Sequence, residues 1–338
     1  MVIVMRKDAD EASVEKVISE VKSRGFSPHI SEGESRTLIG AIGPAPTEEL
    51  REHFAGLAGV ETVVRISKPF KLASREFRHD DSFVMIGGVK TGNGRFVVAA
   101  GPCGVESREQ TLEAAEIVRR TGAQVLRGGA YKPRTSPYAF QGLGEQGLEI
   151  LAEARASTGL PIVTEVTTPE LVEKVASVAD MLQVGARNTQ NFALLAEVGR
   201  SGRPVLFKRG MSTSVSEFLQ AAEYILSQGN SQVVLCERGI RTFETSTRFT
   251  LDVSAVPVLK ELSHLPVWVD PSHAAGRRSL VTSLALAGAA AGADGIIVEV
   301  HPRPEEAKSD AAQQLDEAEF RALMSRLGAV VQALGKSL

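Results

Sequence analysis

The chain has 338 residues, of which 43% are hydrophobic and 23% are charged, as is usual for a globular protein. Its net charge of -3 argues against general nucleic-acid binding, so a basic site would have to be local. The N-terminal VIVM is too short for a signal peptide, and no apolar run approaches the roughly 20 residues of a membrane span. We therefore expect a cytoplasmic protein with neither a membrane nor a nucleic-acid partner.

The first 70 residues show the pattern of a small α/β domain. The expected strands are 2–4, 29–31, 37–42 and 60–66. A first helix is expected from the apolar stripe 12–21 and should end at Gly25, and a second, 46–54, should begin at Pro46. This βαββαβ order is that of ferredoxin-like domains, which are frequent as regulatory modules. A structural role in folding or oligomer contacts is the alternative.

Residues 71–95 are expected to connect this domain to the rest of the chain. The stretch 68–81 is polar and charged, which is typical of a linker. The stretch 84–96 contains four glycines and is expected to form a hairpin that plugs one end of the domain that follows.

Beyond Phe96, apolar runs recur, and nearly every run ends in glycine or a charged residue before a helical stretch begins. The expected strands are 97–100, 125–126, 162–164, 181–184, 205–207, 233–236, 267–269 and 296–298. Eight alternating βα units predict a (β/α)8 TIM barrel over residues 96–338. In such barrels the active site lies at the carboxyl ends of the strands.

The segment 125–138, VLRGGAYKPRTSPY, predicts part of such a site. An apolar strand leads into Arg127 and a glycine pair, so Arg127 is expected at the carboxyl end of a buried parallel strand. Lys132 and Arg134 follow, and two prolines restrict the backbone around them. Three cations held close together suit a polyanion.

Seven motifs then occur in order along the chain: AGPCGVES, LRGGAYKPRTSPYAFQGLG, QVGARNTQNF, LFKRGMS, LCERGIRTFE, VDPSHAAGRR and IIVEVHP. With the N-terminal domain, they resemble type I 3-deoxy-D-arabino-heptulosonate-7-phosphate synthase, in the subgroup with a ferredoxin-like regulatory domain. The resemblance covers essentially the whole chain. It implies a metal-dependent, aldol-type condensation of phosphoenolpyruvate with erythrose 4-phosphate and water, which releases phosphate and opens the shikimate pathway of aromatic amino acid biosynthesis.

The resemblance also assigns substrate-binding residues. Phosphoenolpyruvate carries a phosphate and a carboxylate, and guanidinium groups match both anions in a bidentate manner. The expected phosphoenolpyruvate ligands are Arg127, Lys132, Arg187, Lys208 and Arg238. Arg134 and Thr135 are expected to hold the phosphate of erythrose 4-phosphate. The expected catalytic residues are Lys132, as proton donor to the new alkoxide, and Glu165, which orients Lys132 or a water or serves as a structural partner of the bases.

Residues of metal-binding type also fall at or beyond strand ends. Those that match the family's ligands are Cys103, His273, Glu299 and Asp310. A sulfur, an imidazole and two carboxylates accept manganese, iron, cobalt or zinc, so the resemblance implies one divalent metal ion of unspecified identity. His301 is a further candidate by residue type. Asp270 is expected to support His273. Two cysteines are too few for a disulfide framework, and the second one, Cys236, is expected to be structural because the family gives it no metal role.

Three alternatives remain open. The nearest is 3-deoxy-D-manno-octulosonate-8-phosphate synthase, which takes arabinose 5-phosphate; Pro133 argues against it, because that family usually has asparagine at this place. A Schiff-base aldolase using Lys132 or Lys208 is the second, and an amino-acid sensor built on an inactive barrel is the third.

The N-terminal domain carries the expectation of regulation. The resembling subgroup uses it for end-product control, so tyrosine or phenylalanine is the expected effector. We expect the contact region to be the loop 29–37. Binding between two such domains would require an oligomer, and a homodimer or homotetramer is expected.

Overall fold

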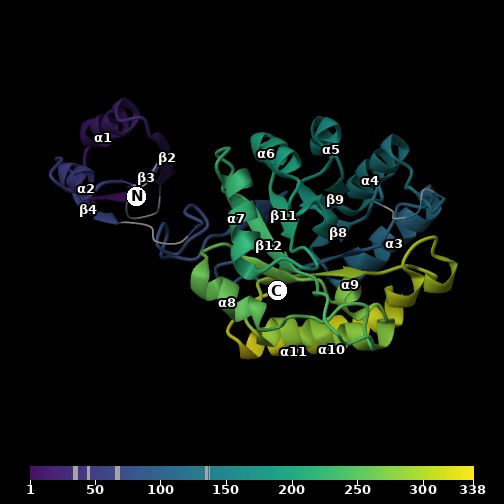
Figure 1. Cartoon of the computed structure of the whole chain (residues 1–338). Helices are drawn as coiled ribbons and strands as arrows, with labels where there is room; N and C mark the ends of the chain where they lie inside the picture. The colour runs from purple at the N-terminus through teal and green to yellow at the C-terminus, as the bar shows by residue number, and fades with distance from the viewer. Residues whose placement is uncertain (33–36, 44–45, 65–68, 134–135, 137) are drawn as a thin grey trace. The chain divides into compact units, whose positions relative to one another are not determined.

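The computed structural model describes residues 1–32, 37–43, 46–64, 69–133, 136 and 138–338. Within these residues the chain divides into two compact units, Met1–Asp80 and Asp81–Leu338 (Figure 1). The first is a small antiparallel sheet with two helices, and the second is a closed barrel of parallel strands. Both predicted fold types are confirmed.

The first unit has the predicted βαββαβ order. Its elements are β1 (Val2–Met5), α1 (Glu11–Ser23), β2 (Ser27–Glu32), β3 (Thr37–Ile42), α2 (Glu48–Ala55) and β4 (Val60–Val64). The strand order is β2-β3-β1-β4, and every neighbouring pair is antiparallel, as in ferredoxin-like domains. Alternate residues of β1, Ile3 and Met5, are fully buried against Val17 and Val21 of α1, because successive side chains of a strand point to opposite faces.

Local capping sets both helix starts of this unit. The carboxylate of Asp10 accepts a hydrogen bond from the Ser13 amide at 2.9 Å, and the hydroxyl of Thr47 accepts one from the Leu50 amide at 3.3 Å. Helix α2 therefore begins at Glu48, two residues after the predicted start at Pro46, because Thr47 is its N-cap.

The stretch after β4 differs from the predicted polar linker. Four of its apolar residues are no more than 4% exposed: Phe70, Leu72, Ala73 and Phe77. The ring of Phe77 lies 5.9 Å from that of His29 in β2, so this segment packs onto the small sheet. Its polar residues alternate with buried apolar ones, which is why composition alone resembled a linker.

The second unit is a barrel of eight parallel strands, with strand order β10-β11-β12-β13-β14-β7-β8-β9. The strands are β7 (Val97–Gly101), β8 (Val125–Arg127), β9 (Ile162–Val166), β10 (Met181–Val184), β11 (Val205–Lys208), β12 (Val233–Glu237), β13 (Val267–Val269) and β14 (Gly295–Glu299). All eight coincide with predicted apolar runs. They are buried on both sides, which explains why they read as continuous apolar segments instead of alternating ones.

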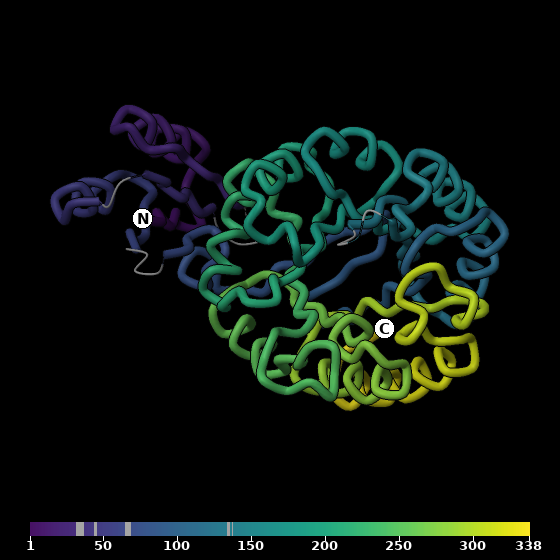
Figure 2. The backbone as a smooth tube through the Cα atoms, turned by 45° about the vertical axis from the view of Figure 1, so that its right-hand side comes forward, coloured from purple at the N-terminus to yellow at the C-terminus, as the bar shows by residue number. Residues whose placement is uncertain are grey.

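Helices alternate with these strands and lie outside them, as a ring of coils (Figures 1 and 2). They are α3 (Arg108–Thr121), α4 (Glu145–Thr158), α5 (Val172–Val178), α6 (Phe192–Arg200), α7 (Val215–Leu226), α8 (Ala255–Leu262), α10 (Arg278–Ala290) and α11 (Glu317–Ala333), with a short α9 (Pro271–Ala275) before α10. Close approach to the barrel wall explains the single glycine of α10, Gly288. A Cβ at Gly288 would lie 3.0 Å from Val269 of β13.

The predicted hairpin closes the amino end of the barrel. It consists of β5 (Val84–Ile86) and β6 (Val89–Thr91), which pair antiparallel. Val84 and Ile86 are fully buried in one cluster with residues at the beginnings of barrel strands, including Trp268. The indole of Trp268 donates a hydrogen bond to the Thr91 hydroxyl at 2.8 Å. The opposite, carboxyl end is left for the site.

Candidate active site

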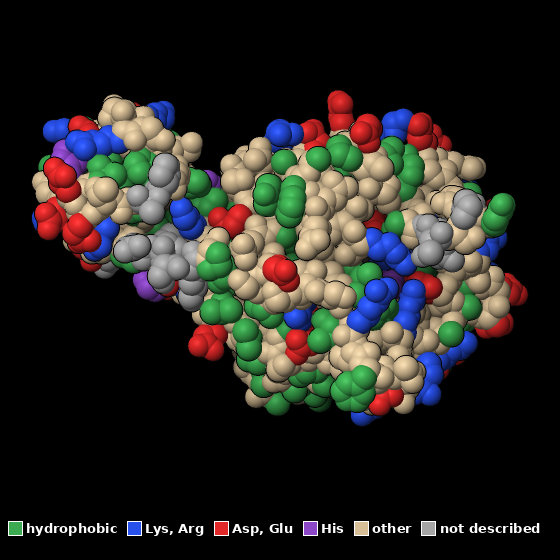
Figure 3. Space-filling model, viewed as in Figure 1, with side chains coloured by type: hydrophobic (Ala, Val, Ile, Leu, Met, Phe, Trp, Pro, Cys, Tyr) green, Lys and Arg blue, Asp and Glu red, His purple; other side chains and the backbone are tan. Residues whose placement is uncertain are grey.

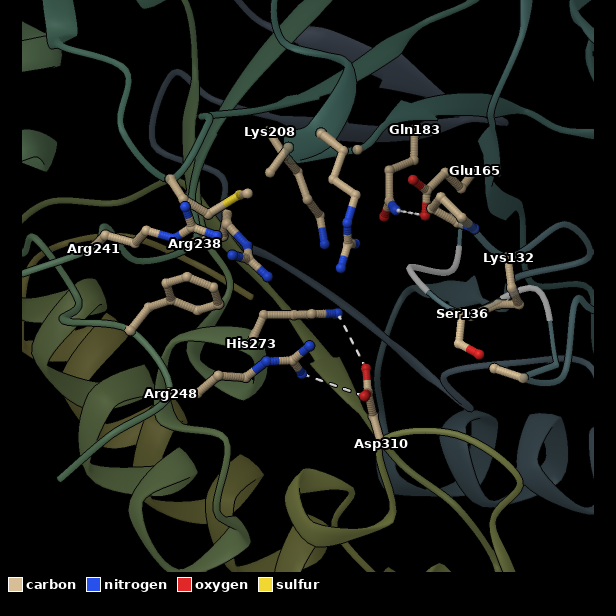
Figure 4. Close-up of a pocket in the computed structure, with 17 residues that line it drawn as sticks. Lys132, Ser136, Glu165, Gln183, Lys208, Arg238, Arg241, Arg248, His273 and Asp310 are labelled. Carbon is tan, nitrogen blue, oxygen red and sulfur yellow. Dashed lines mark hydrogen bonds and ion pairs between the residues drawn. The ribbon is translucent and has the colours of Figure 1, made fainter. Parts of the chain in front are cut away.

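A cavity of about 390 Å³ opens at the carboxyl ends of the barrel strands. The cations among its described lining residues are Lys132, Arg187, Lys208, Arg238, Arg241 and Arg248, against the carboxylates Glu165 and Asp310 (Figure 4). Lys and Arg side chains also gather on this part of the barrel surface in Figure 3. In a chain whose net charge is negative, this local excess of positive charge fits a small, multiply charged anion.

Lys208 ends strand β11 and points into the cavity. Its Nζ atom donates a hydrogen bond to Oδ2 of Asp270 at 2.5 Å, and both side chains are buried. Burial alone would raise the pKa of Asp270, but the positive charges of His273 and Lys208 bring it well below its ordinary value. Lys208 is therefore held in place by a carboxylate that stays ionised.

Arg238 follows strand β12 and is only 5% exposed. Its guanidinium lies 4.4 Å from the ring centroid of Phe249, and Nη1 has no hydrogen-bond partner among the described residues. Burial lowers the pKa of Arg238. The negative charge of Asp270 acts in the opposite direction but does not cancel the effect of burial. A buried guanidinium nitrogen without a hydrogen-bond partner among the described residues is costly, so Nη1 of Arg238 indicates a place for an anionic ligand.

Arg187 and Glu165 lie at neighbouring strand ends. Arg187 is exposed at the rim, in the short turn after β10. Glu165 of β9 accepts a hydrogen bond from the Gln183 amide at 3.2 Å. A Cβ at Gly185 would lie 2.0 Å from Oε1 of Glu165, so only glycine leaves room for this carboxylate in its present position.

Arg127 is brought to the site by β8, but it is not among the described residues that line the cavity. Its Nη1 atom instead donates to Oε1 of Glu299 at 2.9 Å and to the Pro102 carbonyl at 3.0 Å. Its Nε atom is buried without a partner in the described part of the chain. Arg127 thus lies behind the cavity wall and joins the cation set to the residues of metal-binding type.

Those residues of metal-binding type come together as expected. One ligand atom each from Cys103, Glu299 and Asp310 lies within 4.8 Å of the others. Nε2 of His273 lies 3.6 Å from Oε1 of Glu299 and 3.8 Å from Oδ2 of Asp310. His301, the further candidate by residue type, faces Glu106 at 3.7 Å instead.

The charges of this cluster follow from its burial. Burial, together with the negative charge of Glu299, raises the pKa of the Cys103 thiol to about 11. Burial would also raise the pKa of Glu299, but the positive charges of His273 and Arg127 lower it to about 2. A divalent cation would meet an ionised carboxylate here and would favour the thiolate form of Cys103.

Lys132 connects the cluster to the cavity. Its Nζ atom donates to the Cys103 carbonyl at 2.9 Å and lies 3.0 Å from Sγ of the same residue. Asp270, expected to support His273, does so: its Oδ2 lies 2.8 Å from Nδ1 of His273, and its Oδ1 accepts the His273 amide at 3.0 Å.

Other functional candidates come from a segment that sequence reasoning did not single out. Arg241, Arg248 and Phe249 lie between β12 and α8 and line the cavity. Arg248 donates to Oδ1 of Asp310 at 3.3 Å (Figure 4). Arg241 stands inside the motif LCERGIRTFE, so a signal was present. Cys236 is a free, buried thiol in β12, and Arg134 and Thr135 lie outside the described residues.

Comparisons with known proteins agree with this architecture. The model of the DAHP synthetase I family matches residues 39–333, and that of the DAHP synthase ferredoxin-like domain matches residues 1–68. No helix within the described residues combines the length and the apolar composition needed to cross a membrane.

Individual relatives give the same picture. The chain is 51% identical to a phospho-2-dehydro-3-deoxyheptonate aldolase of Thermotoga maritima, over 99% of both chains. A crystal structure of that aldolase superimposes with a TM-score of 0.79, covering 99% of this chain and 98% of the other. A 2-dehydro-3-deoxyphosphooctonate aldolase of Bradyrhizobium diazoefficiens is 34% identical, over 75% of this chain and 96% of its own.

Proposed function

Because the chain belongs to the DAHP synthetase I family and is an enzyme of that synthase type, we propose that it condenses phosphoenolpyruvate with erythrose 4-phosphate and water. The products are 3-deoxy-D-arabino-heptulosonate 7-phosphate and inorganic phosphate. The observation that carries this proposal is the cation-lined cavity, with its unpaired Arg238, directly beside the cluster of Cys103, Glu299 and Asp310.

Phosphoenolpyruvate is assigned to the cations at the ends of successive strands. Arg238 and Arg187 suit its phosphate, because guanidinium groups bind such anions through two parallel hydrogen bonds. Lys208 is fixed by Asp270 and supplies a further positive charge. Arg127, bound to Glu299, acts from behind the cavity wall, and Lys132 lies between this set and the cluster.

The cluster fits one divalent cation. Cys103, His273, Glu299 and Asp310 offer sulfur, nitrogen and oxygen donors, a mixed set that suits transition metals such as manganese, iron, cobalt or zinc. When bound there, such an ion would act as a Lewis acid on the aldose carbonyl. Arg134 and Thr135, outside the described residues, are the proposed binding groups for the aldose phosphate.

The chain's own residues account for the remaining chemistry. C3 of phosphoenolpyruvate forms a bond to the aldose carbonyl carbon, and Lys132 donates a proton to the oxygen that becomes a hydroxyl. C2 becomes electron-poor and takes up water, after which its bond to the phosphate oxygen breaks. Arg187, Lys208 and Arg238 stabilise the phosphate charge throughout. Glu165, fixed by Gln183, is proposed to orient Lys132 or a water.

Arabinose 5-phosphate is the competing second substrate. The octulosonate relatives are 31–35% identical over 66–75% of this chain, whereas the heptonate aldolase of Thermotoga maritima is 51% identical over 99% of it. This difference favours erythrose 4-phosphate.

A phosphate-release assay tests the proposal. Phosphoenolpyruvate is supplied with erythrose 4-phosphate or arabinose 5-phosphate, with and without a chelator, on wild type and on Cys103→Ser and His273→Ala. We expect phosphate release when the second substrate is erythrose 4-phosphate but not when it is arabinose 5-phosphate. Release should be lost in the presence of the chelator and in both variants, whose circular dichroism spectra should match that of wild type. Preference for arabinose 5-phosphate, or full turnover in excess chelator, would contradict the assignment. Borohydride trapping of a substrate on Lys132 or Lys208 would instead support a Schiff-base aldolase.

A further inference from the structure

Two adjacent glutamines, Gln313 and Gln314, are buried behind the metal-type cluster. They are 2% and 0% exposed, and neither is among the described residues that line the cavity. Buried amides must satisfy all their hydrogen bonds, so their partners show what they hold in place. Both amides have well-defined partners on each side.

The Gln313 amide lies between two charged side chains. Its Nε2 atom donates to Oε2 of Glu299 at 2.6 Å, and its Oε1 atom accepts from Nη1 of Arg248 at 3.1 Å. An ionised carboxylate can only accept and a guanidinium can only donate, so the amide has one permitted orientation. Glu299 is thereby held with its other oxygen, Oε1, towards Arg127 and His273.

The same Arg248 also contacts Asp310. Nη1 of Arg248 donates to Oδ1 of Asp310 at 3.3 Å, while Oδ2 of Asp310 lies 3.5 Å from Sγ of Cys103. The contact between Arg248 and Asp310 is drawn in Figure 4. The Gln313 backbone amide donates to the Asp310 carbonyl at 3.1 Å. Asp310 has a positive φ of 50°, which is uncommon for a residue other than glycine, so these contacts stabilise a backbone conformation that the residue does not otherwise favour.

The Gln314 amide holds the third member of the cluster through its backbone. Its Oε1 atom accepts from the Cys103 amide at 3.0 Å, and its Nε2 atom donates to the Ser309 carbonyl at 2.8 Å. It thus joins the loop after β7, which carries Cys103, to the residue before Asp310. These partners again permit only one amide orientation.

We propose that Gln313 and Gln314 are positioning residues that set the metal affinity of the site, by fixing Glu299, Asp310 and Cys103 relative to one another before an ion binds. The proposal rests on the metal site of the proposed function. Groups that orient metal ligands in this way typically change metal affinity by roughly ten- to hundred-fold when they are removed.

The test replaces each amide by a side chain of similar shape without hydrogen bonds, Gln313→Met and Gln314→Met. Gln124→Met is the control, because Gln124, at the other end of β7, accepts from a backbone amide and donates to a backbone carbonyl, as Gln314 does. Its Oε1 atom accepts from the Val98 amide at 2.8 Å, and its Nε2 atom donates to the Gly122 carbonyl at 3.0 Å. Each metal-free protein is titrated with Co²⁺ alone, following the thiolate-to-cobalt absorption band, and its thermal unfolding midpoint is measured.

We expect the Kd for Co²⁺ to rise roughly ten- to hundred-fold in both variants and to stay unchanged in Gln124→Met, with activity recovering at saturating Co²⁺. Wild-type Kd values in both variants would overturn this inference and leave the proposed function standing. The inference would also be overturned if, at an equal loss of thermal stability, the Kd rose no more in these variants than in Gln124→Met. Absence of the cobalt band in wild type would overturn the metal site itself, and this inference with it.

Should either methionine variant fail to fold, Gln313→Asn and Gln314→Asn take its place. They keep a polar amide but shorten its reach by one methylene, so the contacts to the cluster are weakened without an apolar side chain among the buried polar groups. A rise in Kd is again the expected result, and an unchanged Kd again overturns the inference.

Discussion

Buried cations in this protein differ by whether a carboxylate accompanies them. Arg127 has Glu299 and Lys208 has Asp270, whereas Nη1 of Arg238 has no hydrogen-bond partner among the described residues. The ion pair compensates the charge of such a buried cation, although Nε of Arg127 also lacks a partner among the described residues. A guanidinium nitrogen without a partner can still donate a hydrogen bond to a ligand. Substrate affinity should therefore depend most directly on Arg238.

We predict that Arg238→Ala raises the KM for phosphoenolpyruvate roughly ten- to hundred-fold, because one charge-assisted contact contributes about 1.5 to 3 kcal/mol. Arg238→Lys should fall between, since lysine keeps the charge but not the planar contact with Phe249. Arg134→Ala is the crossed control and should raise the KM for erythrose 4-phosphate instead. The measurement is steady-state kinetics with each substrate varied in turn. If both alanine variants raise the KM values for phosphoenolpyruvate and erythrose 4-phosphate equally, the prediction is wrong.

Among the elements, the β5–β6 hairpin shows how the barrel separates stability from catalysis. Ile86 lies in the cluster at the amino end, whereas the cavity lies at the carboxyl end. The next residue towards the N-terminus, Met85, points away and is 39% exposed. Because the amino end of the barrel is used for packing, the carboxyl end can hold charged groups.

We therefore predict that Ile86→Ala lowers the free energy of unfolding by about 2 to 5 kcal/mol, since it empties space in a fully buried cluster. Met85→Ala, in the same strand, should cost far less. Urea unfolding of both variants, together with their KM values, provides the measurement. A shift in KM without a loss of stability would mean that the hairpin acts on the site and is not merely a plug.

Strand β2 of the first unit contains a group that responds to pH. Burial lowers the pKa of His29, whose ring lies beside Phe77. A folded pKa below the unfolded one means that folding favours the neutral ring. Stability is then full above the ordinary pKa of about 6.5 and declines as the pH falls below it.

We predict faster amide hydrogen exchange in β2 and β3 at pH 5.5 than at pH 7, once intrinsic rates are corrected for. In His29→Gln, which does not titrate, this difference should disappear. Equal protection of the wild-type strands at both pH values would show that protonation of His29 is not linked to the folding of this unit.

At the scale of the whole molecule, every residue assigned to catalysis or to the metal lies in the second unit, Asp81–Leu338. The first unit is thus available for another role, and we propose feedback control by tyrosine or phenylalanine. The suggested contact loop, 29–37, lies partly outside the described residues.

We predict that a chain beginning at Asp81 is active but no longer inhibited by tyrosine or phenylalanine, whereas the full chain is inhibited. The cut belongs there because Phe77 packs on the first unit, while Asp81 bonds to Lys260 of the second at 3.2 Å. Inhibition assays on both forms decide the matter. Equal inhibition of both would place the effector on the barrel, and insensitivity of both would leave the first unit a structural role.

The fold was largely determined by the sequence alone. Short apolar runs such as 181–184 and 267–269, each followed by a helical stretch, are typical of strands buried on both faces of a parallel sheet, and eight of them in order favour a closed barrel. Side chains at the ends of these strands must meet at one end of the barrel. Hence Lys208, Arg238 and Glu299 could be assigned to one site before any coordinates.

Tertiary structure decided which of these side chains pair with each other. Sequence spacing gives no sign that Arg127 binds Glu299 or that Lys208 binds Asp270. The members of each pair are far apart in the sequence, and only the closed barrel brings their strands to within one strand of each other. For the same reason Gln313 and Gln314 carried no signal: an amide is common in any sequence, and only its buried partners reveal its task. Chain order fixes which strand ends converge, but atomic contacts between them arise only once the barrel closes.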